Sequence, residues 1–390
     1  MPHQILVVDD EPDLELLVTQ KLRRQIRDKQ FEFFFGRNGE EALEILSHHP
    51  GIDLVLSDIN MPVMDGLTLL GKLSGTSRTR KAVIVSAYGD MANIRTAMNR
   101  GAADFLMKPI DFADLEVTVH KILTEIAHLK EAAENQERLQ LIERELTVAA
   151  RIQQWMLPRD FPPFPGRSDF ELHGAMTPAK EVGGDLFDFF LLDDDHLGVV
   201  IGDVSGKGVP AALFMAVTRT LLRGVALEGK SPGECLDYVN ARLCSQSDSS
   251  MFVTLFYGIL NTRTGEFRFA SGGHNPPYLF KPGGHPRQLH GTGCLIVGCI
   301  PAAKYCTDGC ILAPGEALLL YTDGVTEAMS NADEFFGEER LEKYLNEHVS
   351  TSAEQLVTNL LASLKTFAAD APQSDDITAL VLRHTPPAVG

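Results

Sequence analysis

With 390 residues, 44% of them hydrophobic and 23% charged, the chain has the length of two ordinary domains and the composition of a core-forming globular protein. Its formal net charge of -18 argues against nucleic acid as the main partner, because phosphate backbones are bound by clustered Lys and Arg. The N-terminus lacks a basic region before a long apolar run, and no uncharged stretch approaches the roughly 20 residues of a membrane span, so we expect a cytoplasmic protein without a membrane partner.

Residues 1–123 alternate short apolar runs with helical patterns. The predicted strands are 5–8, 31–35, 54–57, 83–85 and 105–107, and the predicted helices are 14–26, 39–46, 67–73 and 91–100. Alternating strands and helices predict a doubly wound α/β domain, in which a parallel sheet is covered on both faces. Loops at the carboxyl ends of its strands then form the functional edge.

The next segment, residues 112–157, contains no Gly or Pro and ends at Pro158, which predicts one long helix with residues 124–157 as a linker. It carries two apolar seams with heptad spacing, one formed by Leu115, Val119, Ile122, Ile126 and Leu129 and the other by Leu139, Ile142, Leu146 and Ala149. The register slips between them at Gln136, which makes this position a candidate hinge. We favour a homodimer through a parallel coiled coil over 112–157; the alternative is a helix packed on its own domains.

Residues 158–384 are rich in strands separated by Gly and Pro turns. The predicted strands are 197–201, 252–260, 267–270, 317–321 and 377–382, and the predicted helices are 209–226, 231–243 and 352–369. This pattern predicts an α+β domain with a β-sandwich core, followed by a frayed tail at 385–390. Six cysteines lack zinc spacing and are expected to be reduced structural thiols: Cys235, Cys244, Cys294, Cys299, Cys306 and Cys310.

Polar side chains end four of the predicted N-terminal strands. Asp9 and Asp10 follow the first strand, Asp58 the third, Ser86 the fourth and Lys108 the fifth. Three carboxylates at one sheet edge would repel each other without a cation, and Mg²⁺ prefers such oxygen ligands. Asp58 could then attack a phosphoryl donor as a nucleophile, while the metal and Lys108 neutralise charge on the transferring group.

These residues, with the run 61–66 (MPVMDG), resemble the response-regulator receiver family and its CheY-like, flavodoxin-like fold over the whole N-terminal segment. The resemblance implies phosphorylation of Asp58 by a sensor histidine kinase or a phosphotransfer protein. It implies Mg²⁺ ligation by Asp9 or Asp10, Asp58 and the backbone carbonyl of Asn60. It also implies that Ser86 and Phe105 move on phosphorylation and that the Lys108–Pro109 peptide bond is cis. The alternative is an α/β domain with unrelated loop acids.

Four acidic motifs mark the C-terminal domain: 182–185 (VGGD), 201–208 (IGDVSGKG), 321–324 (YTDG) and 374–376 (SDD). Each places an acid at or just past an apolar run, and three have a Gly beside it, which allows close approach of the backbone to an ion. Carboxylates drawn from separate strand ends indicate one shared site. Such all-oxygen ligands select Mg²⁺ or Mn²⁺, and two of these ions can activate water for attack on a phosphoester.

Other readings of single motifs are weaker. Residues 202–208 look faintly like a phosphate-binding loop, but Lys207 is not followed by Ser or Thr. His274, within 272–277 (GGHNPP), is either a base or ligand, or part of a structural turn beside the site. The Gly-x-Ser-x-Gly motif of Ser-His-Asp hydrolases is absent.

Together the acidic motifs resemble the bacterial SpoIIE/RsbU-like branch of the type 2C (PPM) metal-dependent serine/threonine phosphatases, over nearly all of residues 145–384. The run 149–158 (AARIQQWMLP) is similar to the regulatory helix that opens this branch. The resemblance implies two Mn²⁺ or Mg²⁺ ions held by Asp185, Asp203, the carbonyl of Val204, Asp323 and Asp375, with Asp376 as a further ligand or a supporting acid. Eukaryotic relatives grip the substrate phosphate with an early Arg, and we identify no matching Arg here.

These observations predict a response regulator in which phosphorylation of Asp58 changes dimer or linker geometry and thereby controls the phosphatase. The resemblance implies that the substrate is a phosphorylated anti-sigma-factor antagonist of the STAS type. An adaptor that binds without catalysis is one alternative, but it would not need four separate acids. A DNA-binding response regulator is the other, and the negative charge and lack of a basic recognition helix disfavour it.

Overall fold

The computed structural model describes residues 2–74, 79–87, 91–246, 251–292 and 295–385. Cys294 and residues 386–390 of the expected tail lie outside the described residues. The chain forms two compact units, Met1–Ile142 and Glu143–Gly390. The domain limits at residues 123, 157 and 384 stay predictions.

The first unit contains a parallel sheet of five strands in the order β2-β1-β3-β4-β5. Its strands are β1 (His3–Val8), β2 (Phe31–Gly36), β3 (Ile52–Asp58), β4 (Lys81–Ala87) and β5 (Asp104–Lys108). Its helices are α1 (Pro12–Lys21), α2 (Arg23–Arg27), α3 (Gly39–His48), α4 (Gly66–Leu73), α5 (Met91–Asn99) and the first part of α6 (Phe112–Met156). Separate apolar cores cover the two faces, which confirms the predicted doubly wound fold.

One predicted helix of this unit is wrong. The segment 14–26 is not continuous, because Leu22 leaves the helical backbone at φ -99° and ψ 18° and separates α1 from α2. The Leu22 side chain is buried in the same core as Val18. The break therefore keeps both side chains in the apolar layer under the sheet.

The first seam of α6 is not available for a coiled coil. Leu115, Val119 and Ile122 are each 1% exposed and belong to the core that covers one face of the parallel sheet. Over this stretch the alternative reading is correct, since the heptad spacing serves packing on the helix's own domain. The second seam differs, because Leu139 is 61% exposed and Ile142 is 43% exposed.

The second unit is a sandwich of two five-stranded antiparallel sheets, ordered β13-β10-β9-β8-β7 and β12-β11-β14-β15-β6. The first sheet contains β7 (Leu186–Leu191), β8 (His196–Val204), β9 (Val253–Asn261), β10 (Glu266–Gly272) and β13 (Asp308–Ile311). The second contains β6 (Phe170–Thr177), β11 (Tyr278–Phe280), β12 (Arg287–Gln288), β14 (Ala317–Tyr321) and β15 (Ile377–His384). One apolar core joins the facing sides of both sheets, so the predicted β-sandwich is confirmed.

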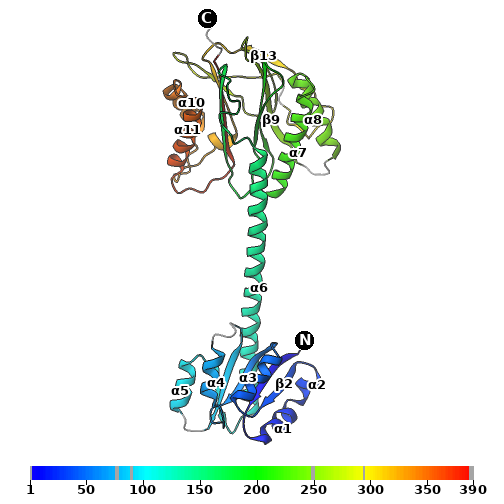
Figure 1. Cartoon of the computed structure of the whole chain (residues 1–390), viewed down its shortest axis with the longest axis vertical. Helices are drawn as coiled ribbons and strands as arrows, with labels where there is room; N and C mark the ends of the chain where they lie inside the picture. Colours follow the sequence, from blue (N-terminus) through cyan, green and yellow to red (C-terminus); the bar gives the residue numbers. More distant parts are fainter. Residues whose placement is uncertain (1, 75–78, 88–90, 247–250, 293–294, 386–390) are drawn as a thin grey trace. The chain divides into compact units, whose positions relative to one another are not determined.

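Helices cover the outer sides of the sandwich (Figure 1). The first sheet is covered by α7 (Val209–Ala226) and α8 (Pro232–Gln246), and the second by α10 (Gly337–His348) and α11 (Ala353–Ala368). A single turn, α9 (Asp323–Thr326), follows β14. Among the described residues, α7 alone is long and apolar enough to cross a membrane by length and composition. Its residues Ala211, Met215 and Leu222 are buried against the first sheet, as expected of a core helix.

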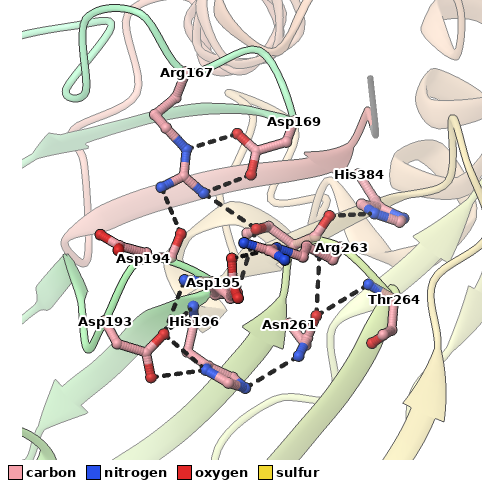
Figure 2. A network of polar contacts seen from close by, with 11 residues as sticks. Arg167, Asp169, Asp193, Asp194, Asp195, His196, Asn261, Arg263, Thr264 and His384 are labelled. Carbon is pink, nitrogen blue, oxygen red and sulfur yellow. Dashed lines mark hydrogen bonds and ion pairs between the residues drawn. The ribbon is translucent and has the colours of Figure 1, made fainter. Parts of the chain in front are cut away.

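A polar network closes one end of the sandwich (Figure 2). Arg167 donates to both carboxylate oxygens of Asp169, and this contact lowers the pKa of Asp169 to about 2. In the turn between β7 and β8, Asp193 pairs with His196. The ring of His384, at the end of β15, lies 2.8 and 3.0 Å from two backbone carbonyl oxygens. These contacts fix one set of strand ends, and the acidic motifs occupy the opposite set.

Candidate functional site

The structure brings together the acids predicted at the edge of the parallel sheet. Carboxylate oxygens of Asp9, Asp10 and Asp58 lie within 4.8 Å of one another. Lys108 reaches the same place from β5, with its Nζ 2.7 Å from Oδ2 of Asp58 and 2.9 Å from Oδ2 of Asp9. Three carboxylates and one ammonium therefore meet where the strands end. The carboxylates supply oxygen donors of the kind that a hard divalent cation prefers.

Burial and ion pairing determine the pKa values of Asp9 and Lys108 at the edge of the parallel sheet. Burial raises the pKa of Asp9, and the hydrogen bond from Lys108 opposes the rise. Burial alone lowers the pKa of Lys108, but its hydrogen bonds to Asp58 and Asp9 outweigh it and raise that pKa above its usual range. Lys108 is therefore an ammonium at neutral pH. The Ile59 N–H donates to Oδ1 of Asp58 at 2.6 Å, so both oxygens of this carboxylate are held.

The other predicted residues of this unit take different positions. Ser86 is buried on β4, whereas Asn60 is exposed in the loop after β3 and Phe105 is 36% exposed. The Lys108–Pro109 peptide bond is cis. Glu11 was not predicted, yet its carboxylate lies 3.0 Å from the Lys108 ammonium. An acid one position past the Asp pair carried no separate signal in the sequence.

In the second unit, the acids of all four motifs lie at the same end of the sandwich. Asp185 precedes β7 and Asp203 is near the end of β8, so the antiparallel pair places them together on the first sheet. Asp323 follows β14, while Asp375 and Asp376 precede its antiparallel neighbour β15 on the second sheet. The two sheets thus present carboxylates from four strand ends.

Asp185 is the most deeply buried acid of this group, at 1% exposure. Its Oδ2 accepts hydrogen bonds from Oγ1 of Thr322 at 2.7 Å and from Oγ1 of Thr378 at 2.5 Å. Burial, followed by the charge of Asp203, raises the pKa of Asp185 well above its usual range. The two threonines hold this carboxylate in one orientation, and sequence reasoning missed both of them.

The neighbouring acids also repel one another. Burial, followed by the charges of Asp323 and Asp375, raises the pKa of Asp203 to about 7. Burial and the charge of Asp375 likewise raise the pKa of Asp323. Buried and partly buried carboxylates in this arrangement need cations to remain ionised together, and their all-oxygen donor set suits Mg²⁺ or Mn²⁺. The residues present therefore fit the pair of ions that the sequence predicts.

Asp376 uses its carboxylate to hold backbone. Oδ1 accepts from the Ala179 N–H at 2.8 Å, and Oδ2 accepts from the Gly184 N–H at 2.6 Å. A Cβ on Gly183 would lie 2.3 Å from Oδ2 of Asp376, and one on Gly324 would lie 1.9 Å from its carbonyl oxygen. These contacts favour the supporting role for Asp376. At Gly183 and Gly324 the structure shows a close approach between two loops of the chain.

His274 lies next to the strand β9, close to the position of Asp203 on β8. It is buried, and its Nδ1 is 2.8 Å from Oγ1 of Thr254, the residue opposite Asp203 in the β8–β9 register. Burial lowers the pKa of His274 to about 4, so the imidazole is neutral at pH 7. The contact with Thr254 favours the structural reading of this motif.

Two further side chains contact the acid-bearing loops. Lys207 places its Nζ 3.0 Å from Oδ2 of Asp375 and also donates to the Ser374 carbonyl. Gln153, a buried residue near the end of α6, donates to the Gly183 carbonyl at 2.6 Å and accepts from the Gly183 N–H at 3.0 Å. Residues near the end of α6 are thus bonded to the loop that carries Asp185.

Family models match both halves of the chain. The response regulator receiver domain model matches residues 5–120, and the model of Stage II sporulation protein E (SpoIIE) matches residues 193–385. Phosphoserine phosphatase RsbU of Bacillus subtilis is 31% identical over 246 residues, which are 63% of this chain and 71% of RsbU. Protein IcfG of a Synechocystis species is 33% identical over 266 residues, or 61% of this chain. The chain covers only 41% of the length of IcfG.

The solved structures agree on the fold of the second unit. The SiaA-PP2C domain of Pseudomonas aeruginosa superposes with a TM-score of 0.57 at 23% identity, covering 63% of this chain and 98% of that domain. At this identity the likeness speaks for the fold alone. The sandwich with its outer helices is thus a PP2C-type fold.

Proposed function

Because the chain belongs to the SpoIIE/RsbU-type phosphatases and carries a response-regulator receiver domain, we propose that it is a response regulator whose output is hydrolysis of phosphoserine or phosphothreonine on a protein. One observation carries the proposal: the buried Asp185 and the partly buried Asp203 and Asp323 lie together, with raised pKa values, at one end of a PP2C-type sandwich. Such acids are costly in a domain that only binds a partner.

In the receiver, Asp9, Asp10, Asp58 and the carbonyl of Asn60 would hold Mg²⁺. Asp58 attacks the phosphoryl group of a phosphohistidine on a sensor kinase or phosphotransfer protein, forming a P–O bond as the P–N bond breaks. Lys108, already 2.7 Å from Asp58, stabilises the charge on the transferring group. Ser86 and Phe105 are the residues proposed to move when Asp58 is phosphorylated.

In the phosphatase domain, two Mn²⁺ or Mg²⁺ ions would be held by Asp185, Asp203, the carbonyl of Val204, Asp323 and Asp375. Bound ions of this kind supply activation of the attacking water and neutralise phosphoryl oxygens. Thr322 and Thr378 orient the Asp185 carboxylate through the hydrogen bonds described above. Asp376 holds the loop that precedes Asp185.

A cleft beside Asp375 offers room for the substrate. It has a volume of about 470 Å³, and its walls include Gly324, Met329, Leu361 and Gln373. Apolar side chains from α11 provide much of this surface, as suits a peptide segment around a phosphorylated side chain. We infer a phosphorylated anti-sigma-factor antagonist of the STAS type as the substrate, in the cytoplasm. The family resemblance and the similarity to RsbU support this choice.

We assign signal transmission to α6, with the register slip near Gln136 as the transmission point. The exposed second seam around Leu139 and Ile142 would pair two copies of the chain, because apolar side chains along a helix favour burial in a partner. Gln153 links the helix to Gly183, two residues before Asp185. A change in helix packing at the seam would then bias the position of a metal-binding carboxylate.

Hydrolysis of a synthetic phosphoserine peptide tests the proposed activity. We expect phosphate release in Mn²⁺ to fall by at least ~10²-fold in EDTA or in the Asp323→Asn variant, the scale of removing a transition-state charge stabiliser. The matched control is Asp160→Asn, which neutralises an exposed acid in a loop away from the four motifs. Full hydrolysis in EDTA, or by Asp323→Asn, would rule out the two-metal mechanism.

A further inference from the structure

The loop between β8 and α7 presents one lysine beside the acids of the sandwich. Gly206 and Gly208 flank Lys207 with φ values of 90° and 78°, a backbone region that side-chain-bearing residues rarely adopt. A Cβ on either glycine would meet no atom within 4 Å among the described residues. Open space therefore lies beside the backbone at both glycines that flank Lys207, and the Lys207 side chain reaches Asp375.

Lys207 acts electrostatically on the acid cluster. Its ammonium lies 3.0 Å from Oδ2 of Asp375, and its side chain remains 41% exposed. Burial and the charge of Asp375 raise the pKa of Asp323, and the charge of Lys207 opposes that rise. It opposes the rise in the pKa of Glu327 in the same way. The ammonium thus faces both the carboxylates and the solvent from which a substrate arrives.

A phosphate monoester adds to the negative charge of this site. It brings about two negative charges at neutral pH, and the five carboxylates of the acidic motifs already exceed the charge of two divalent ions. A further cation beside the ions would lower the free energy of the bound phosphate. Lys207 is placed to supply it, because a lysine ammonium is a mobile point charge on a flexible stem.

We propose that Lys207 binds a non-bridging phosphoryl oxygen of the substrate and is the phosphate-gripping residue of this phosphatase. The proposal rests on the proposed function. Lys207 exchanges Asp375 for the phosphoryl oxygen, and the exchange costs little because partly exposed ion pairs contribute weakly to stability. The competing explanation is that Lys207 is only a counter-ion that holds Asp375 and the Ser374 carbonyl.

Inorganic phosphate is the probe that separates the two explanations. In the Mn²⁺-loaded full chain, we expect Lys207→Met to weaken phosphate binding by about tenfold or more, measured by calorimetry. The KM for a phosphoserine peptide should rise by a similar factor, with a smaller change in kcat. Mn²⁺ affinity should stay the same or increase, because a cation beside the ions has been removed. Lys207→Arg should restore phosphate binding in part.

Two lysines serve as comparisons. Lys230 has a side-chain exposure of 38% and pairs with Glu228 beyond the far end of α7, so Lys230→Met removes a similar charge away from the acids. Lys365 lines the cleft beside Asp375, so Lys365→Met tests a rival cation. Phosphate binding should survive both substitutions. If Lys365→Met alone weakens it, Lys207 is not the gripping residue.

The outcomes also separate this inference from the proposed function. If Lys207→Met alters Mn²⁺ affinity but binds phosphate as the wild type does, Lys207 is a counter-ion and the inference is overturned while the phosphatase stands. If the wild type binds phosphate through Lys207 but does not hydrolyse the peptide, the inference holds and the proposed activity fails. A wild type that does not bind phosphate in Mn²⁺ overturns the inference, while hydrolysis of the phosphoserine peptide decides the proposed function separately.

Discussion

Neutralising Asp203 should stabilise the metal-free protein while it abolishes catalysis. The pKa of this carboxyl rises from 3.8 to about 7, first through burial and then through Asp323 and Asp375. Since each pKa unit corresponds to about 1.36 kcal/mol, ionised Asp203 weakens the folded state by about 4 kcal/mol at pH 8. Asp203→Asn removes this penalty but leaves a partly buried amide that must find new hydrogen-bond partners. We therefore expect a net gain of about 1–3 kcal/mol.

The sign of the pH dependence follows from proton binding. Folded Asp203 binds its proton more tightly than unfolded Asp203, so the free energy of unfolding of the wild type falls as the pH rises between about 4 and 7. The penalty at pH 5 is about 40% of its full value, and it is nearly complete above pH 7. The advantage of Asp203→Asn should therefore be clearly smaller at pH 5 than at pH 8.

Thermal unfolding in EDTA measures this difference. At about 2–4 °C per kcal/mol, the phosphatase transition of Asp203→Asn should lie about 2–12 °C above that of the wild type at pH 8. The gap should shrink at pH 5. Saturating Mn²⁺ should reverse the order, because the wild type gains more from metal binding. A variant that is less stable than the wild type at pH 8 in EDTA would refute the reasoning about repulsion among these acids.

Three further variants test the rest of the account. Asp58→Ala should remove labelling by acetyl phosphate in Mg²⁺, and equal labelling of both proteins would disprove the phosphoacceptor assignment. Replacing Leu139 and Ile142 by Lys should weaken dimerisation in light scattering while both domains stay folded, whereas a variant that remains dimeric and responsive would exclude the second seam as the transmitter. Val119→Lys, which buries a charge at a site with 1% exposure, should lower receiver stability by about 3 kcal/mol or more in denaturant titration. An unchanged midpoint would contradict the assignment of the first seam to the receiver core.

The sequence predicted most of the strands that carry the acids because each of these is a short apolar run with a polar residue at one end. The strands of the parallel sheet, such as β1 and β3, are buried on both faces. They therefore appear in the sequence as continuous apolar runs. The strand β7 was missed although it lies between two acidic motifs. Asp188 interrupts its apolar run, and only the structure shows that this buried acid is paired with Arg219 and Arg223 of α7.

The other misses share a physical cause. Heptad spacing records that a helix buries one face, but not whether the partner is a second chain or its own sheet, so the seam at Leu115 and Val119 was misassigned. Thr322 and Gln153 act through contacts with residues distant in the sequence, at 2.7 Å to Asp185 and 2.6 Å to the Gly183 carbonyl. The sequence around Thr322 and Gln153 does not predict the hydrogen-bond partner of either residue.

The central claim is that the state of Asp58 controls hydrolysis in the same chain. The most direct test is the rate of phosphate release from a phosphoserine peptide in Mn²⁺, before and after treatment of the full chain with beryllofluoride and Mg²⁺. We expect the wild-type rate to change by about fivefold or more, as coupling free energies of about 1–3 kcal/mol imply. The Asp58→Ala rate should not change. A wild-type rate that is the same in both states would contradict the account.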